Sequence, residues 1–382
     1  MNFDLSEEQL ILKKTVRDFA ENEIAPKAKE LDKNEEFSYE LTAKMGEIGL
    51  FGICVSPDYG GMGMDTLSYI IAVEELARVD ASQAATVVAE NSLGIGPLAC
   101  FGNEEQKRKY LPKLVTGEKL WGFGLTEPNA GSDAGGTKTT GKLEKGEWII
   151  NGSKIFITNA STKITWGSTI QCISGTNGEG KKEYSCILVE NGTPGFEAKA
   201  MKEKLVWRSS NTSELYFDNV RVPEENLLGK RGEGFRQMLE TLDGGRLSIA
   251  AMGVGGAQGA FDLAMKYSKE REQFGKPISK FQATAFKLAD MATEIEAARN
   301  LLYKACWLKD NKKPFSKEAA MAKLYCSEVM YRVVNHAVQI HGGYGLMEEY
   351  NVARFYRDQK LLEIGEGTSE VQRLVISRLI GC

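Results

Sequence analysis

The spacing of apolar positions predicts a helical region from Leu5 to about residue 120. Several apolar side chains there recur at helical intervals and would form one buried stripe: Leu12, Val16, Phe19, Ala20 and Ile24. Ser6 and Gln9 have the spacing of a capping box, which predicts that the first helix begins beside them. Pro26 predicts a break or kink, and the Gly-rich segment 56–63 predicts a turn between two helices.

From about Trp121 to about residue 232 the pattern changes to short β-prone runs. Residues 148–150 and 154–158 are two such runs, and Asn151-Gly152 between them predicts a hairpin turn. Residues 185–190 and 213–222 also predict strands, the second ended by Pro223. This portion is therefore expected to be a compact, mostly β unit.

A helical pattern returns from about Glu233 and continues to the end of the chain. One stretch places its apolar residues on a single helix face: Leu288, Met291, Ile295, Ala298 and Leu302. The order of helices, strands and helices predicts three domains, over residues 1–120, 121–232 and 233–382.

Composition narrows the range of functions. With 42% hydrophobic and 26% charged residues in 382, the chain is typical of a globular protein. A net charge of −4 argues against nucleic acid as a partner, because phosphate binding needs a concentrated cationic surface. Seven scattered Cys residues favour reduced thiols. We expect no signal peptide, no membrane span and a location in the bacterial cytoplasm.

Several kinds of chemistry are disfavoured. The only two histidines, His336 and His341, lack ligand spacing, so we expect no metal site, and no GxSxG elbow or Walker A motif is present. Residues 253–258 imitate a dinucleotide-binding loop, but Gln258 replaces the third glycine and a helix-like run precedes the segment. Small residues that let two helices pack closely are the favoured interpretation.

Four segments carry candidate chemistry. Residues 125–133 (LTEPNAGSD) form a turn-rich loop whose backbone can approach a planar polar ligand closely. Residues 271–278 (REQFGKPI) contain an Arg suited to a pyrophosphate. Residues 339–345 (QIHGGYG) have adjacent glycines. Residues 364–370 (IGEGTSE) place a carboxylate between two glycines, where it could reach a substrate as a base.

Together, and in this order, the four segments resemble the acyl-CoA dehydrogenase family over essentially the whole chain. The resemblance implies a helical N-terminal domain, a β-barrel-like middle domain and a C-terminal four-helix bundle. It implies FAD as cofactor and Glu366 as catalytic base. The implied FAD contacts are Phe123, Leu125, Thr126, Ser132, Phe156, Thr158, Arg271, Phe274, Gln282, Gln339, Gly343, Thr368 and Glu370, of which Arg271 and those after it reach the FAD of a neighbouring subunit.

Substrate contacts follow from the same resemblance. Ser132, Arg246 and Gly367 are expected to contact the acyl-CoA. One branch of the family carries its base at the position of Gly245, which offers no acid here, and this leaves Glu366 as the candidate. Glu90 is the next acid to consider, although a solvated helix residue is the favoured interpretation for it. His341 is expected to be structural.

The reaction implied is α,β-dehydrogenation of an acyl-CoA to the 2-enoyl-CoA, with electrons passed to an electron-transfer flavoprotein. The resemblance also implies a homotetramer built as a dimer of dimers. An enoyl-CoA reductase running in reverse, an oxygen-using oxidase and a non-catalytic CoA-binding module are alternatives. Gly365 and Phe156 stand where many relatives carry Tyr and Trp, and Val206 replaces a usual glycine. We therefore expect a branched, cyclic or aromatic acyl group, with a straight short or medium chain as the alternative.

Overall fold

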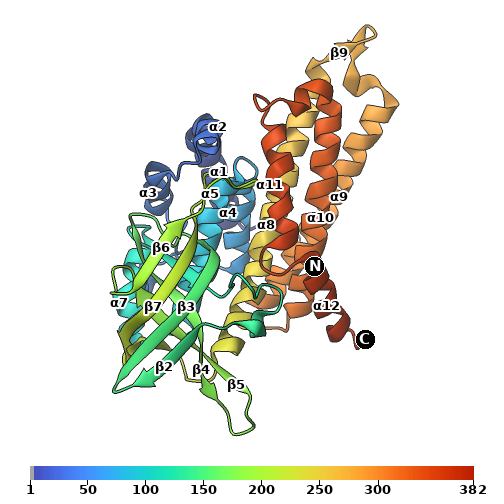
Figure 1. Ribbon diagram of the computed structural model, residues 1–382. Coiled ribbons are helices and arrows are strands. Elements are labelled where there is room, and N and C mark those ends of the chain that lie inside the picture. Colours follow the sequence, from blue (N-terminus) through green and yellow to red (C-terminus); the bar gives the residue numbers. More distant parts are fainter. Residues whose placement is uncertain (1–3) are drawn as a thin grey trace.

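The structure is a computed structural model that describes residues 4–382, and it has three regions (Figure 1). The first consists of helices α1 (Glu7–Phe19), α2 (Ala25–Asn34), α3 (Tyr39–Glu47), α4 (Thr66–Ala77), α5 (Ala81–Val88), α6 (Gly96–Phe101) and α7 (Glu104–Val115). The Ser6–Gln9 capping box is confirmed. Pro26 lies in the first turn of α2, directly after a π-helical turn, Ala20–Ile24, and the backbone stays in the helical conformation through this point.

The middle region is an eight-stranded sheet. Its strands are β1 (Leu120–Gly124), β2 (Thr140–Glu144), β3 (Glu147–Thr158), β4 (Thr165–Thr176), β5 (Lys182–Glu190), β6 (Phe196–Ala200), β7 (Thr212–Pro223) and β8 (Leu227–Leu228). They follow the order β6-β7-β3-β2-β4-β5-β8, and β1 pairs in parallel with β4. Alternate side chains of β3 and β7 point into a core with Trp148 at its centre. The predicted strands at 185–190 and 213–222 are confirmed.

The predicted hairpin at Asn151-Gly152 is wrong. Both residues lie inside the continuous strand β3, and the turn into that strand is made by Lys145 and Gly146, both at positive φ. Gly152 instead sits at a register shift against β7, and a Cβ at this position would lie 2.5 Å from Thr139 Oγ1. A close approach between strands, rather than a turn, therefore requires this glycine.

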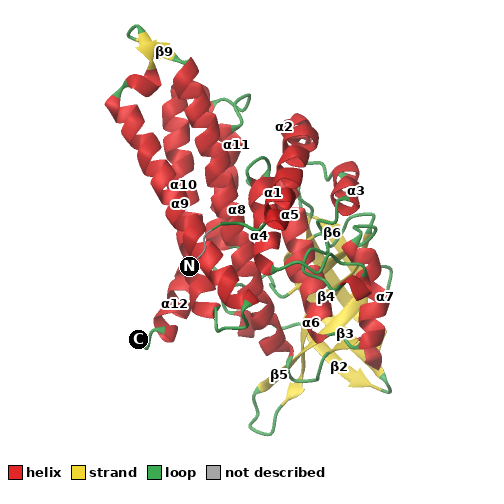
Figure 2. Ribbon diagram, turned by 180° about the vertical axis from the view of Figure 1, so that it is seen from behind, coloured by secondary structure: helices red, strands yellow, loops and turns green. Residues whose placement is uncertain are grey.

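The C-terminal region is a bundle of long helices: α8 (Gly234–Glu270), α9 (Gln282–Asp310), α10 (Ser316–His341), α11 (Val352–Ile364) and the shorter α12 (Ser369–Leu379). A small hairpin of β9 (Glu272–Gln273) and β10 (Lys276–Pro277) forms its far tip (Figure 2). The predicted apolar stripe of α9, from Leu288 to Leu302, is buried as expected.

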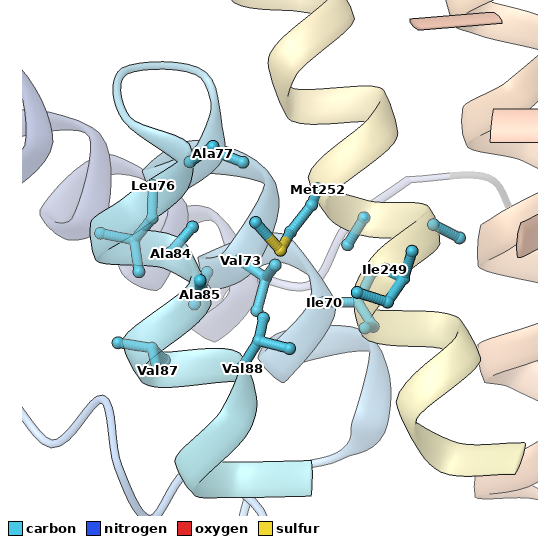
Figure 3. Close-up of a cluster of buried hydrophobic side chains, with 14 of the residues drawn as sticks. Ile70, Val73, Leu76, Ala77, Ala84, Ala85, Val87, Val88, Ile249 and Met252 are labelled. Atoms are coloured by element: carbon cyan, nitrogen blue, oxygen red, sulfur yellow. The ribbon is translucent and has the colours of Figure 1, made fainter. Parts of the chain in front are cut away.

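The N-terminal helices pack directly against α8, as Figure 3 shows for Ile70 and Val73 of α4 beside Ile249 and Met252 of α8. Glycines of α8 permit this contact, because a Cβ on Gly255 would lie 2.2 Å from the carbonyl oxygen of Glu74. The interpretation of residues 253–258 as a helix-packing segment is therefore confirmed.

One helical stretch bears on the expectation that the chain has no membrane span. The continuous helical stretch Ala81–Phe101 is long and apolar enough, by length and composition only, to cross a membrane. In this fold the whole of α5 is buried among other elements, so its apolar character is accounted for by core packing.

Candidate active site

The acid at position 366 lies on a hinge between α11 and α12. Glu366 has a left-handed backbone, with φ 51°, and Gly367 follows with φ 92°. Two side chains hold the hinge: Lys323 of α10 donates to the Gly367 carbonyl at 2.6 Å, and Gln372 donates to the carbonyls of Glu366 and Gly367 at 3.2 and 2.9 Å. Thr368 caps α12 by accepting from the Val371 amide. The backbone is thus held at the acid and on its C-terminal side.

The Glu366 carboxyl points at α8. A Cβ added to Gly245 would lie 1.8 Å from Glu366 Oε2, so the glycine at this position makes room for the acid. Glu366 Oε2 is buried and makes no hydrogen bond within residues 4–382. The two candidate positions for a base, 245 and 366, therefore lie side by side, and only position 366 carries an acid.

Burial raises the pKa of the Glu366 carboxyl to about 7, although the positive charges of Lys323 and Arg246 oppose the rise. Burial lowers the pKa of Lys323 to about 8, and the charge of Glu366 opposes that fall. A carboxyl with a pKa near neutrality can accept a proton and release it again at physiological pH.

Arg246 is buried beside the same acid. Its guanidinium pairs with Asp243 one turn earlier on α8, and Asp243 also accepts from the Ser316 hydroxyl at 2.7 Å. Arg246 Nε has no partner within the described chain. An unused, buried donor on an arginine is suited to an anionic or carbonyl ligand.

The candidate flavin loop follows β1. Phe123 and Leu125 are buried, Thr126 and Thr158 are half-buried, and Ser132 is exposed. Lys154, wholly buried, donates to the Leu125 carbonyl at 3.1 Å and to Glu127 at 2.8 Å. Glu127 also accepts from the amides of Lys138 and Thr139 at 2.7 and 3.0 Å. These contacts fix both ends of the loop.

The surface beside this loop fits a planar ligand. Phe156 has φ 62° and leaves 61% of its surface exposed, next to Thr158 on the same strand. A Cβ added at Gly131 would meet nothing within 4 Å, so the loop borders open space. An exposed aromatic ring beside turn-rich backbone suits the apolar and polar edges of an isoalloxazine.

Five of the remaining predicted cofactor residues lie at the far tip of the bundle, whereas Thr368 and Glu370 lie at the start of α12. Phe274, 93% exposed, and Gln339 line a hollow of about 340 Å³ between the hairpin and the ends of α9 and α10. Arg271 lies over the Tyr344 ring at 5.8 Å, Gln282 begins α9, and Gly343 is exposed. Figure 1 places this tip at the opposite end of the bundle from α12. One subunit therefore does not bring the two sets of residues together.

The roles of four residues near the hinge and the loop were not predicted from the sequence. Lys323 could have been found, because its helical spacing with Ala319, Cys326 and Met330 places a lysine on a buried face. The roles of Gln372 and of the Lys154–Glu127 pair depend on contacts between distant segments, which no local pattern predicts.

The interpretation of Glu90 as a solvated helix residue is wrong. Glu90 is wholly buried in a π-helical turn, Ala89–Ile95, and accepts from the Trp121 amide at 3.0 Å. Burial raises the pKa of this carboxyl well above its ordinary value. It joins the N-terminal helices to the sheet. His341 is also buried, where it stacks on Tyr267 at 4.4 Å and its Nδ1 contacts the Ala337 carbonyl.

Helices, sheet and helices in this order, with a buried acid on a glycine hinge, are the arrangement of a family of FAD-dependent oxidoreductases. Family models named acyl-CoA dehydrogenase N-terminal, middle and C-terminal domain match residues 6–118, 122–220 and 232–381. The chain belongs to the acyl-CoA dehydrogenase family. The predicted family, fold and cofactor are thereby confirmed.

Similar proteins extend over the full length of the chain. A probable acyl-CoA dehydrogenase, YngJ, of Bacillus subtilis is 52% identical over 378 residues, 99% of each chain. The butyryl-CoA dehydrogenase structure from Megasphaera elsdenii is 45% identical, with a TM-score of 0.96 and full coverage of both chains. A chain in a structure described as the electron transferring flavoprotein of Acidaminococcus fermentans is 48% identical, with a TM-score of 0.95 and full coverage of both.

Proposed function

We propose that this protein oxidises the Cα–Cβ bond of a short, straight-chain acyl-CoA and that Glu366 removes the α-proton. The observation that carries the proposal is the state of the Glu366 carboxyl. It is buried, its pKa is raised to about 7, its Oε2 has no hydrogen bond within the described chain, and it stands on a fixed hinge. A base with these properties is matched to proton removal at neutral pH.

The protein's own groups supply alignment and charge. Bound FAD supplies the acceptor for the hydride that leaves the β-carbon. We assign the thioester oxygen to the backbone amide of Glu366 and the CoA to Ser132, Arg246 and Gly367. The loop after β1, with Phe123, Leu125, Thr126, Ser132, Phe156 and Thr158, holds the FAD of its own subunit. A dry site around Glu366 favours stabilisation of the enolate oxygen as the proton leaves.

The space beside the hinge supports a straight chain over the branched, cyclic or aromatic group expected from sequence. The expectation depended on Gly365, Phe156 and Val206, and the largest volume was the one that Gly365 leaves beside the base. A Cβ at Gly365 would meet Leu361 Cδ2 at 2.9 Å, so the Leu361 side chain already occupies part of that volume. Likeness to a butyryl-CoA dehydrogenase agrees with this choice.

The proposal also includes an oligomeric assembly and an electron acceptor. The tip residues Arg271, Phe274, Gln282, Gln339 and Gly343 belong to the end of the bundle opposite α12, so we assign them to the FAD of a neighbour. By the family resemblance we assign Thr368 and Glu370, at the start of α12, to the same FAD. We propose a homotetramer built as a dimer of dimers, and the likeness to a bacterial relative supports a location in the bacterial cytoplasm. An electron-transfer flavoprotein is the proposed acceptor, supported by the likeness to a chain in such a structure.

The test is Glu366→Gln, which keeps the shape of the side chain but cannot take up the proton. Anaerobic mixing with butyryl-CoA should bleach the flavin at least about a hundredfold more slowly than in the wild type. FAD content and butyryl-CoA affinity should be unchanged. A smaller effect would exclude Glu366 as the base, and Glu90→Gln would then be measured in the same way. Rapid reoxidation of the reduced wild type in air would instead indicate an oxidase.

A further inference from the structure

The ammonium of Lys323 lies in a position that is unusual for a lysine. The side chain comes from the middle of α10, and the residue is completely buried. Within residues 4–382 its one hydrogen bond goes to a backbone carbonyl, that of Gly367, at 2.6 Å. Burying an ammonium is costly unless charge and hydrogen bonds compensate. A single neutral acceptor offsets the cost of burying the ammonium poorly, so fold stability alone does not explain a lysine at this position.

The contacts between Lys323 and the hinge give a functional reason for its burial. The carbonyl that accepts from Lys323 belongs to the residue directly after Glu366, and the charge of Glu366 acts on the ammonium. Gln372 donates to the same carbonyl at 2.9 Å but carries no charge. The hinge therefore has one cationic and one neutral support, and the two can be separated by substitution.

We propose that Lys323 is a positioning residue that fixes the Gly365–Gly367 hinge and supplies the positive charge that keeps Glu366 ionised. The inference rests on the proposed role of Glu366 as base. Without a nearby cation, a carboxyl buried to this degree would hold its proton and would not act as a base at neutral pH. If Lys323 formed a direct ion pair with Glu366, the proton affinity of the Glu366 carboxyl would fall too far for it to act as a base. An ammonium held on the neighbouring carbonyl of Gly367 lowers that affinity by an intermediate amount.

The other groups around Glu366 do not replace this charge. Arg246 on α8 also opposes the rise in the pKa of Glu366, but its guanidinium is paired with Asp243. Tyr69 on α4 is buried and hydrogen-bonds with the Ser248 hydroxyl at 3.0 Å. Glu363 and Glu370 act on Lys323 through their charges and favour its protonated form. Of the cations that act on Glu366 within residues 4–382, Lys323 is thus the one without a carboxylate partner at hydrogen-bonding distance.

The experiment compares Lys323→Met with Gln372→Met in the holoenzyme. Both remove a hydrogen bond to the hinge, but only the first removes a charge. The acid limb is the part of the kcat/KM profile that falls at low pH. In Lys323→Met this limb should shift to higher pH by about one pH unit or more. In Gln372→Met the rate should fall while the limb stays in place. Lys323→Arg keeps the charge, so its acid limb should lie close to that of the wild type.

A second measurement does not depend on turnover. The pKa of the Glu366 carboxyl is read by ¹³C NMR of glutamate-labelled holoenzyme, with Glu366→Gln identifying the signal. It should rise in Lys323→Met and stay unchanged in Gln372→Met. An unchanged value in Lys323→Met, or an equal rise in both variants, would overturn the proposal. If Glu366→Gln remained active while the ¹³C shift occurred, the role of Glu366 as base would fail and the coupling to Lys323 would stand.

Discussion

Two buried lysines in this chain act on a glutamate, and the two pairs are built differently. In the sheet region, Lys154 contacts Glu127 directly at 2.8 Å, and two backbone amides also donate to Glu127. At the hinge, Lys323 donates to the carbonyl of Gly367, and Glu366 Oε2 has no hydrogen bond from any of residues 4–382. The first carboxylate is fully satisfied, whereas the second is left free to react.

The proton affinities differ accordingly. Burial raises the pKa of Glu127, but Lys154 and the hydrogen bonds outweigh it, and the net pKa is lowered. Burial dominates at Glu366, and the net pKa rises to about 7. A satisfied buried pair therefore fixes structure, whereas a separated pair keeps a carboxyl that can exchange a proton near neutral pH.

The largest expected effect comes from breaking the satisfied pair. Glu127→Gln leaves Lys154 buried without its counter-ion, and loss of one partner of a buried pair costs about 3–5 kcal/mol. We expect a clear fall in the urea midpoint and loss of FAD, because the pair fixes the loop after β1. The matched control is Glu179→Gln, whose pair with Lys181 is exposed and should change the midpoint little. Equal midpoints for the two variants would show that the pair is not structural.

The second effect tests the room left for the reactive acid. Gly245→Ala places a methyl group where Glu366 Oε2 lies, since the ideal Cβ would be 1.8 Å away. The carboxyl must move, and a displacement of about 1 Å can lower the rate roughly a hundredfold. Gly244→Ala is the control, because its nearest neighbour is Lys309 Nζ at 3.6 Å. Stopped-flow flavin reduction measures both; a wild-type rate in Gly245→Ala would contradict the position of the acid.

The pH dependence of the wild type follows from the same comparison. Glu366 must be ionised to act, so kcat/KM should rise with pH up to about 7 and then level, falling about tenfold per unit on the acid side. Glu127 acts on stability instead. Its lowered pKa stabilises the fold at pH values above the ordinary pKa of the carboxyl in the unfolded chain. That contribution is lost as the pH falls through the lowered pKa of the folded state. A flat rate profile between about pH 5.5 and 8 would contradict the first statement.

Sequence patterns predicted the parts of this fold that depend on local spacing. The stripe of α9, the capping box at Ser6 and the strand ended by Pro223 need only neighbours in the sequence. Asn151-Gly152 misled because a bulge and a turn share the same residues, and the partner strand β7 decides between them. Glu90 was missed for a related reason, because its burial depends on packing between distant elements, which a charged residue in a helix does not signal by itself. Lys323 differs, because its helical spacing with buried Ala319 and Cys326 does indicate an inward-facing position.

The smallest expected effect concerns the volume beside the hinge. Leu361 stands one turn before Gly365 on α11 and occupies the space that a Tyr at position 365 would need. Leu361→Ala should open that space without touching the acid. The ratio of kcat/KM for isobutyryl-CoA to that for butyryl-CoA should then rise roughly tenfold, which is the discrimination that one or two methyl groups provide in an apolar pocket.

The control for this change is Ile364→Ala on the same helix, whose side chain is 56% exposed and so removes similar volume outside the packed interior. Its substrate ratio should equal that of the wild type. An unchanged ratio in Leu361→Ala would place the acyl group away from Leu361. A wild-type enzyme that already prefers isobutyryl-CoA would overturn the straight-chain proposal, because the branched group would then fit beside Leu361 as it stands. A rise confined to Leu361→Ala would assign this leucine as the side chain that restricts the acyl group next to the base.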